Sequence, residues 1–456
     1  MSTPEIVADV ETTVREVAQR AKEASARLAT LSAEARNTAL ERMAVALERD
    51  EQAILTANAT DVAIAQAALA RGEFSQSLLD RLILDPVKLR SMAAGIRAVA
   101  ALDDPIGAIT TKTRLDQGLE LHRVTVPLGV IAAIFEARPD AVTQIAALAL
   151  KSGNAVLLKG GSEALYTTRA LVTCLRGALV ESNTIPPDAI CAVEQRASVD
   201  ALLALDTLID LVVPRGSNAL VRMVQSRTRI PVLGHAEGVC HVYVDRDADP
   251  QMAVEIVVDS KVQYPAACNA AETVLLDTTT APTILPALLS TLTHHNVEVR
   301  GCPRTLALVT QLAPALPIVP ATDADWGREY GERILACKLV DTIDMAITHI
   351  NQHGSGHTDA IVTANPVAAA YFLTHVDSAS VFHNASTRFA DGYRFGFGAE
   401  VGISTGKLHA RGPVGLSGLT TYKYLLHGHG HLVAPYTGPQ ARPFLHEKIH
   451  ENKSSA

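Results

Sequence analysis

The fold is decided by residues 127–160, which read PLGVIAAIFEARPDAVTQIAALALKSGNAVLLKG. Val130–Phe135 and Ala155–Lys159 are short, uninterrupted apolar runs, as in strands buried on both faces of a parallel sheet. Asp140–Ser152 lies between them as a predicted helix, and Gly153 ends it. A strand, a helix and a second strand in this order predict part of a doubly wound parallel sheet.

The same alternation continues along the chain. The predicted elements are a helix at Ser162–Glu181, strands at Ile190–Glu194 and Leu208–Val213, and, in a second α/β half, strands at Leu306–Val309, Leu335–Val340, Ala360–Thr363 and Ser380–Phe382. Before residue 100, apolar residues recur every three or four positions, which predicts helices. Between Thr110 and Val126, alternating residues around Gln117 and Gly118 predict a projecting hairpin.

Composition excludes several classes of protein. Apolar residues make up 48% of the 456 residues and charged residues 19%, as in an ordinary globular enzyme. The net charge of −8 argues against a nucleic-acid partner. Six cysteines without a CxxC spacing indicate neither a disulfide framework nor a zinc ribbon. The acidic N-terminus lacks a signal-peptide pattern, and we expect a cytoplasmic protein without a membrane partner.

One cysteine stands in a loop suited to covalent chemistry. The segment Lys261–Leu276, KVQYPAACNAAETVLL, places Cys268 among small residues between a helical pattern and a strand pattern. A thiolate attacks acyl carbons and leaves a thioester that accepts hydride, so acyl or aldehyde chemistry is indicated. The alternative is a buried structural thiol. Cys240 competes as a nucleophile, but it lies in a strand pattern where it and His241 face opposite ways, so it is better interpreted as a core thiol.

Three basic residues lie just past the ends of predicted strands. Arg138, Lys159 and Arg215 fall at the carboxyl edge, where open α/β sheets bind ligands. The sequence has no GxGxxG, so the ordinary dinucleotide fingerprint is missing.

The sequence around Cys268 resembles the corresponding region of the gamma-glutamyl phosphate reductase family, a branch of the aldehyde dehydrogenase superfamily. Other similar stretches are Val126–Asp140, Leu150–Ala164, Ile209–Arg222, Gly356–Thr363 and Asn384–Leu416. They follow the family order over most of the chain from about Asp103 to Tyr424. The resemblance implies an aldehyde dehydrogenase-like α/β fold with two doubly wound domains and a small oligomerisation arm. The implied parts are a cofactor-binding domain (1–109 and 127–233), a catalytic domain (234–410), the arm (110–126 and 411–440) and a flexible tail (441–456).

The same resemblance assigns roles to particular residues. It implies Cys268 and Asn269 as the catalytic pair. It implies NADPH or NADP as cofactor, bound by Lys159, Gly160, Gly161, Ser162, Glu163, Arg215, Gly216, Ser217 and Glu329. We expect substrate contacts from Arg138, Asn384, Ser386 and Arg388.

Two departures from the wider superfamily are informative. Hydrolytic aldehyde dehydrogenases carry a water-activating glutamate 34 residues before the nucleophile, where this chain has Gly234, with His235 beside it and Glu237 three residues on. Phe135–Arg138 lies near the position of the superfamily's usual PWN tripeptide, which this chain lacks. The side chain that would donate a hydrogen bond to the oxyanion is therefore not identified. Reduction of an acyl phosphate needs no such water, because a general base there would waste the thioester by hydrolysis.

The resemblance therefore implies NADPH-dependent reduction of L-glutamyl 5-phosphate to L-glutamate 5-semialdehyde in proline biosynthesis. It further implies a homo-oligomer and a possible association with glutamate 5-kinase. The alternatives are an aldehyde dehydrogenase that forms a free acid, or a catalytically silent protein on the same scaffold. His349, His353 and His357 are spaced by four residues, but Gly354 and Gly356 break the helix before the third, so we predict no metal site.

Overall fold

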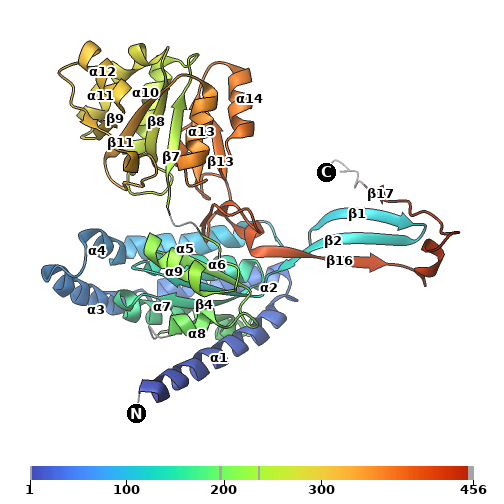
Figure 1. Cartoon of the computed structure of the whole chain (residues 1–456). Helices are drawn as coiled ribbons and strands as arrows, with labels where there is room; N and C mark the ends of the chain where they lie inside the picture. The colour runs from blue at the N-terminus through green and yellow to red at the C-terminus, as the bar shows by residue number, and fades with distance from the viewer. Residues whose placement is uncertain (1–2, 195–197, 235–236, 450–456) are drawn as a thin grey trace. The chain divides into compact units, whose positions relative to one another are not determined.

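The computed structural model describes residues 3–194, 198–234 and 237–449. The chain divides into two compact units, each with its own sheet and core (Figure 1). Unit 1 consists of Met1–Val232, Phe397–Val401 and Gly415–Ala456, and unit 2 of Leu233–Gly396 and Gly402–Val414.

The sheet of unit 1 is parallel and has the order β5-β4-β3-β6. Its strands are β3 (Val130–Phe135), β4 (Ala155–Gly160), β5 (Ile190–Ala192) and β6 (Leu211–Arg215). Helix α6 (Pro139–Lys151) connects β3 to β4. The predicted strand–helix–strand unit is therefore confirmed, with boundaries that differ by one residue.

Helices cover both faces of this sheet. On one face, Val130, Ala132 and Ile134 of β3 share a buried cluster with α1 (Thr3–Leu28), α8 (Ser198–Leu203) and α9 (Asn218–Arg227). Helices α6 and α7 (Leu165–Ser182) belong to the other layer, and α2 and α5 pack against them. The remaining N-terminal helices are α2 (Ala33–Arg49), α3 (Glu51–Ala70), α4 (Gln76–Leu82) and α5 (Pro86–Ala101).

Helix α3 is long and apolar enough to cross a membrane by length and composition alone, which the sequence analysis did not single out. One such helix is weak evidence for a membrane span. Its buried Asp61 accepts hydrogen bonds from the backbone N–H of Tyr166 (3.2 Å) and Thr167 (2.7 Å), two unpaired donors in the first turn of α7. The hydroxyl of Thr167 donates a third bond at 2.6 Å. These contacts are typical of a helix packed against protein.

We expect Asp61→Ala to lower the free energy of unfolding by about 2–3 kcal/mol, because it leaves buried donors at the start of α7 without an acceptor. Thermal unfolding followed by circular dichroism measures the change. Asp206 is exposed, and Asp206→Ala should alter the stability by less than about 0.5 kcal/mol. Equal melting temperatures for the two variants would show that the Asp61 contacts contribute nothing.

A separate antiparallel sheet forms a ribbon in the order β16-β2-β1-β17 (Figure 1). Strands β1 (Ile109–Asp116) and β2 (Leu119–Pro127) are the predicted hairpin, with the turn at Gln117 and Gly118. Strand β16 (Thr420–His427) pairs with β2 along its whole length. Within the segment expected to be a flexible tail, β17 (Glu447–Lys448) pairs with β1. Residues 450–456 of that segment lie outside the described residues.

Unit 2 contains a parallel sheet in the order β10-β9-β11-β8-β7-β12-β13. Its strands are β7 (Cys240–Val244), β8 (Ala271–Asp277), β9 (Glu298–Gly301), β10 (Val319–Pro320), β11 (Ile334–Val340), β12 (Thr358–Val362) and β13 (Ser380–His383). One face packs against α10 (Pro250–Val262), α11 (Ala281–His294) and α12 (Pro303–Leu312). The other packs against α13 (Ile343–His353) and α14 (Pro366–His375). A short antiparallel pair, β14 (Gly402–Ser404) and β15 (Gly412–Val414), completes the unit.

One predicted strand of this unit is wrong. Leu306–Val309 lies inside helix α12, whose first residue is Pro303. Proline at the first helical position has the φ angle a helix needs and no N–H to leave unpaired. The strand of this region is β9, which precedes the proline.

Candidate active site

Cys268 lies in the loop between the end of α10 and the start of β8. Two backbone hydrogen bonds shape this loop, from Ala267 N–H to the Tyr264 carbonyl (3.1 Å) and from Ala270 N–H to the Ala267 carbonyl (2.9 Å). Cys268 is half-buried, whereas the other five cysteines are buried. It is therefore the cysteine that a small molecule can reach.

Cys240 packs against the loop of residues 262–271 that carries Cys268, hereafter the nucleophile loop. Its S–H donates to the backbone carbonyl of Cys268 at 3.3 Å, and its sulfur lies 3.8 Å from Nδ1 of His357. Complete burial raises the pKa of Cys240 well above the ordinary thiol value. His241 instead places Nδ1 2.9 Å from a carboxylate oxygen of Asp359. The interpretation of Cys240 as a core thiol is confirmed.

Asn269 connects the nucleophile loop to the segment 384–390. Its side-chain amide donates to the carbonyl of Ala390 at 2.9 Å, and only 3% of the residue is exposed. On the same segment, Ser386 accepts a hydrogen bond from Arg388 N–H (3.3 Å) and contacts the hydroxyl of Ser260 (3.2 Å) on α10. The two predicted groups, around Cys268 and around Arg388, are thus brought together within unit 2.

Arg388 is buried close to the nucleophile. Its Nε donates to Oε1 of Gln263 at 2.9 Å, and its guanidinium lies 5.8 Å from the ring centroid of Tyr264. Burial lowers the pKa of Arg388, as does the neighbouring Arg394, while the charge of Cys268 acts in the opposite direction. Gln263, which orients this cation, was not singled out from the sequence, because nothing in its local pattern indicates a partner 125 residues away.

Asn384 and Glu329 occupy different surroundings. Asn384 has a left-handed backbone (φ 53°), and its amide accepts from Thr363 N–H and donates to the Thr363 carbonyl, both at 2.9 Å. In this structure its side chain therefore shapes the loop. Glu329 is half-buried in the loop before β11, and its charge acts on the buried residues Lys261 and Glu272.

The carboxyl edge of the unit 1 sheet gathers the predicted cofactor residues. Phe135 of β3 pairs with Gly160 on one side and with Arg215 on the other, so Lys159 and Arg215 flank the end of one strand. Lys159 is buried, and its ammonium group donates to the Gly160 carbonyl. Arg215 donates to Oε1 of Gln144 at 2.8 Å. Gly161 and Ser162 follow at the start of a short 3-10 helix, Ser162–Ala164.

Two carboxylates lie against backbone N–H groups at this edge. Glu163 accepts from Ala137 N–H at 2.6 Å, and Glu136 accepts from Ser217 N–H at 2.8 Å at the N-terminus of α9. Ser217 is the N-cap of α9. Arg138 is half-buried at the N-cap of α6. Sequence reasoning missed Glu136, although its place directly after β3 is the same signal that selected Arg138.

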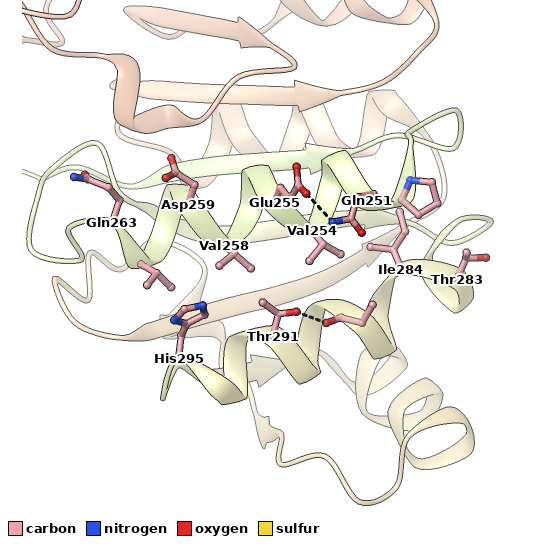
Figure 2. Close-up of a pocket in the computed structure, with 13 residues that line it drawn as sticks. Gln251, Val254, Glu255, Val258, Asp259, Gln263, Thr283, Ile284, Thr291 and His295 are labelled. Carbon is pink, nitrogen blue, oxygen red and sulfur yellow. Dashed lines mark hydrogen bonds between the residues drawn. The ribbon is translucent and has the colours of Figure 1, made fainter.

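A groove of about 550 Å³ runs between α10 and α11 (Figure 2). Apolar side chains such as Val254, Val258 and Ile284 line it, and Glu255 and Asp259 stand along one side. Cys268 is not among its lining residues. Gln263, the C-cap of α10, lines the groove and also bonds to Arg388, so the end of α10 contacts both the groove and the segment 384–390.

The three histidines do not share one helix. His349 and His353 lie on α13, which ends at His353, and His357 follows the break. Nδ1 of His349 lies 3.1 Å from Nζ of Lys338. Burial lowers the pKa of His349 to about 2, with smaller contributions from His241 and Lys338. Within the described ranges, no group of three or more His, Cys, Asp or Glu side chains has the arrangement of a metal site.

Two parallel, helix-covered sheets and a half-buried loop cysteine define a class, the aldehyde dehydrogenases. The sequence model of the aldehyde dehydrogenase family matches residues 4–304. The chain is 54% identical to a gamma-glutamyl phosphate reductase of Synechococcus sp. (strain JA-2-3B'a(2-13)) over 428 residues, which are 94% of this chain and 93% of that protein. The chain therefore belongs to the gamma-glutamyl phosphate reductase branch of the aldehyde dehydrogenase family.

Two further relatives agree with this placement. The gamma-glutamyl phosphate reductase of Haloquadratum walsbyi is 51% identical over 440 residues, 96% of each chain. The crystal structure of gamma-glutamyl phosphate reductase from Thermotoga maritima superposes with a TM-score of 0.87 at 40% identity, covering 92% of this chain and 99% of that one. The predicted fold class is thereby confirmed.

Proposed function

We propose that the protein reduces L-glutamyl 5-phosphate to L-glutamate 5-semialdehyde and phosphate, with NADPH as reductant, as a step of proline biosynthesis. The observation that carries this proposal is the half-buried Cys268, held by backbone bonds beside a buried arginine. The names of the relatives supply the substrate class.

The first step is attack of the Cys268 thiolate on the 5-carbonyl carbon. A C–S bond forms, the C–O bond to the phosphoryl group breaks, and phosphate leaves with the bonding electron pair. The cation of Arg388 lies close enough to interact with the charge of Cys268, so it can bind the substrate's oxyanions beside the nucleophile. We assign the same anchoring role to Arg138.

The oxyanion of the tetrahedral intermediate needs hydrogen-bond donors. Backbone N–H groups at Cys268 and Asn269 are our candidates, each commonly worth about 3 kcal/mol. The side chain of Asn269 is already bonded to Ala390, so it fixes the loop that carries these donors. Ser386 and Asn384 hold the facing segment in the same way.

NADPH, when bound, supplies the hydride. Lys159, Gly160–Glu163 and Arg215–Ser217 are the residues of unit 1 that would hold it, and Glu329 is a further proposed cofactor contact. Among the described residues, the side-chain oxygen of Thr168 is buried without a hydrogen-bond partner in a pocket of about 10 Å³ that Gly160, Gly161 and Val193 also line, which is room for one water-sized polar group. Hydride addition to the thioester carbon gives a thiohemiacetal, whose C–S bond breaks to release the aldehyde and restore the thiolate.

Hydrolysis of the thioester is the competing outcome. Gly234 occupies the place of the superfamily's water-activating glutamate, and Glu237 is half-buried nearby in sequence. His235 lies outside the described residues. The alternative function, an aldehyde dehydrogenase that forms a free acid, requires a base that activates water, and Gly234 cannot supply one.

We also propose a homo-oligomer that assembles through the ribbon. Tyr422, Tyr424 and Leu426 on β16 are all more than half exposed, so this strand offers an apolar face as well as an unpaired edge. We further propose an association with glutamate 5-kinase, because the acyl phosphate product of such a kinase hydrolyses readily in water. A cytoplasmic location is proposed from the lack of a signal-peptide pattern in the acidic N-terminus.

The test is phosphate-dependent oxidation of glutamate 5-semialdehyde, the reverse reaction, followed by NADPH formation. We expect turnover to require phosphate, and the rate to reach a maximum as the phosphate concentration rises. Turnover at the same rate without phosphate would mean that water cleaves the thioester, and the hydrolytic function would replace the proposed one.

A further inference from the structure

A completely buried ion pair closes the base of the nucleophile loop. Lys261 lies in the last turn of α10, and Glu272 is the second residue of β8. Nζ of Lys261 is 2.6 Å from Oε2 of Glu272, and neither side chain is exposed. The residues between them, 262–271, include Cys268. The two ends of this loop are thus joined by a charge-assisted hydrogen bond, the strong type of hydrogen bond.

The pair also reaches the loop that carries Glu329. The second carboxylate oxygen of Glu272 accepts a long hydrogen bond from Gly331 N–H at 3.5 Å. Nζ of Lys261 lies 5.9 Å from the ring centroid of Tyr330. The charge of Glu329 acts on both members of the pair. One buried contact therefore connects the nucleophile loop with the loop assigned to the cofactor.

The neighbours of Lys261 extend this arrangement to the substrate segment. Ser260 bonds to Ser386 (3.2 Å) and accepts from Thr387 N–H (3.2 Å). Gln263 orients Arg388 at 2.9 Å. A single turn of α10 thus holds three segments that the proposed reaction uses.

Stability alone does not explain such a pair. Removing two charges from water costs more than their attraction commonly returns, and apolar residues of similar volume often stabilise a core equally well. Burial is the main influence on both groups, lowering the pKa of Lys261 and raising that of Glu272 to about 7. What an ion pair adds is a fixed distance and direction between two backbone segments.

We propose that Lys261 and Glu272 are positioning residues, which hold the Cys268 loop and the 329–331 loop in the geometry that the reaction needs. This inference rests on the proposed function for its choice of reaction, and on unit 2 alone for its geometry. Neither side chain touches the substrate.

The main test compares Lys261→Met and Glu272→Met with the double variant. Each single variant leaves a buried ionisable group without its partner and should unfold at a lower temperature, while the double variant should recover most of the loss. We expect kcat of the double variant to stay about 100-fold below wild type, with less than a threefold change in the KM for semialdehyde. Recovery of kcat together with the melting temperature would show a merely structural pair and overturn the proposal.

A second readout does not depend on the identity of the substrate. The rate of alkylation by iodoacetamide reports the position and exposure of the Cys268 thiol, with Cys268→Ala as the blank. We expect the double variant to differ from wild type at least about fivefold in this rate. If wild type shows no phosphate-dependent turnover, the proposed function fails while this measurement still decides the positioning role, and an unchanged alkylation rate would refute it.

Glu272→Gln is the variant to use if the methionine variants at positions 261 and 272 do not fold. It keeps the shape and the acceptor for Gly331 while removing the negative charge, and kcat should fall with little change in KM. An unchanged kcat would contradict the proposal. Arg304→Met, which removes a surface ion pair with Asp341, is the matched control and should leave both kcat and alkylation unchanged.

The pH dependence of stability gives an independent check. In Lys261→Met, Glu272 faces Glu329, Tyr330 and Cys240 without its cation, so its pKa should rise above the wild-type value of about 7. A carboxyl group with a raised pKa stabilises the fold fully at low pH and loses that contribution as pH rises through the folded-state pKa. The melting temperature of Lys261→Met should therefore fall more steeply between about pH 6 and pH 8 than that of wild type.

Discussion

Cys268→Ala is expected to reduce phosphate-dependent turnover by about 10⁴-fold or more, because the proposed acyl intermediate forms on the Cys268 sulfur. Of the six cysteines, only Cys268 is half-buried, and its loop is small and held by backbone bonds. Burial keeps Cys174, Cys191 and Cys337 protonated, with pKa values of about 12, 11 and 12. Cys240, the thiol that contacts the Cys268 carbonyl, is likewise kept protonated by burial. Burial acts to raise the pKa of Cys302, but hydrogen bonds from Thr305 and nearby backbone outweigh it and lower that pKa; the Cys302 side chain is buried at the N-cap of α12.

The measurement is NADPH formation from glutamate 5-semialdehyde and phosphate, with intact protein mass spectrometry to detect the acyl enzyme. Cys174→Ala is the control, since Cys174 is buried on α7 of unit 1 and should be dispensable for turnover. A Cys268→Ala protein that retained a tenth of the wild-type rate would exclude the covalent route, and direct hydride transfer to the acyl phosphate would have to be considered.

The fold of unit 1 could be predicted from local signals because its strands are short, apolar and separated by helices with clear ends. β3, α6 and β4 agree with the predicted elements to within a residue or two. The error at Leu306–Val309 has a physical origin. A four-residue apolar run fits a strand and a helix equally well, and here Cys302–Pro303 begins a helix. The true strand, β9, includes Glu298 and Arg300 and so lacks the apolar signature.

The candidate site was predictable only in part. Cys268 was selected because the loop that carries it resembles the cysteine region of the family, and Lys159 and Arg215 because they follow strand ends in stretches that resemble the family. Lys261 and Gln263 were not found, because their partners lie on other segments and only the folded chain brings them together. Glu163 was predicted as a cofactor residue and Glu136 was missed, and the hydrogen-bond partner of each carboxylate became apparent only in the folded chain. Both carboxylates bond to backbone N–H groups at the edge where cofactor binding was predicted.

Gly238→Ala is the second substitution with a large expected effect. A β-carbon at position 238 would lie 1.9 Å from the carbonyl oxygen of Cys268, 2.6 Å from its carbonyl carbon and 2.7 Å from its Cα. These atoms are backbone, so no side-chain rotation can relieve the overlap. Either the nucleophile loop or the segment before β7 must move.

The same carbonyl accepts the S–H of Cys240, so a displaced loop also loses that contact. A shift of about 1 Å at a reacting atom commonly costs about 100-fold in rate, and we expect kcat of Gly238→Ala to fall by that amount. The melting temperature should fall by only a few degrees, since the overlap is local. The matched control is Gly406→Ala in the same unit, where the nearest atom to an added β-carbon is the Ser404 hydroxyl at an ordinary 3.7 Å.

The two effects of Gly238→Ala can be separated by measuring each on the same sample. If kcat falls in proportion to the fraction of folded protein, the glycine serves folding alone. If folded protein turns over slowly while the KM for semialdehyde is unchanged, the close approach of residue 238 sets the position of the nucleophile. We expect the second result, because the clashing atoms belong to Cys268 itself and not to the surrounding core.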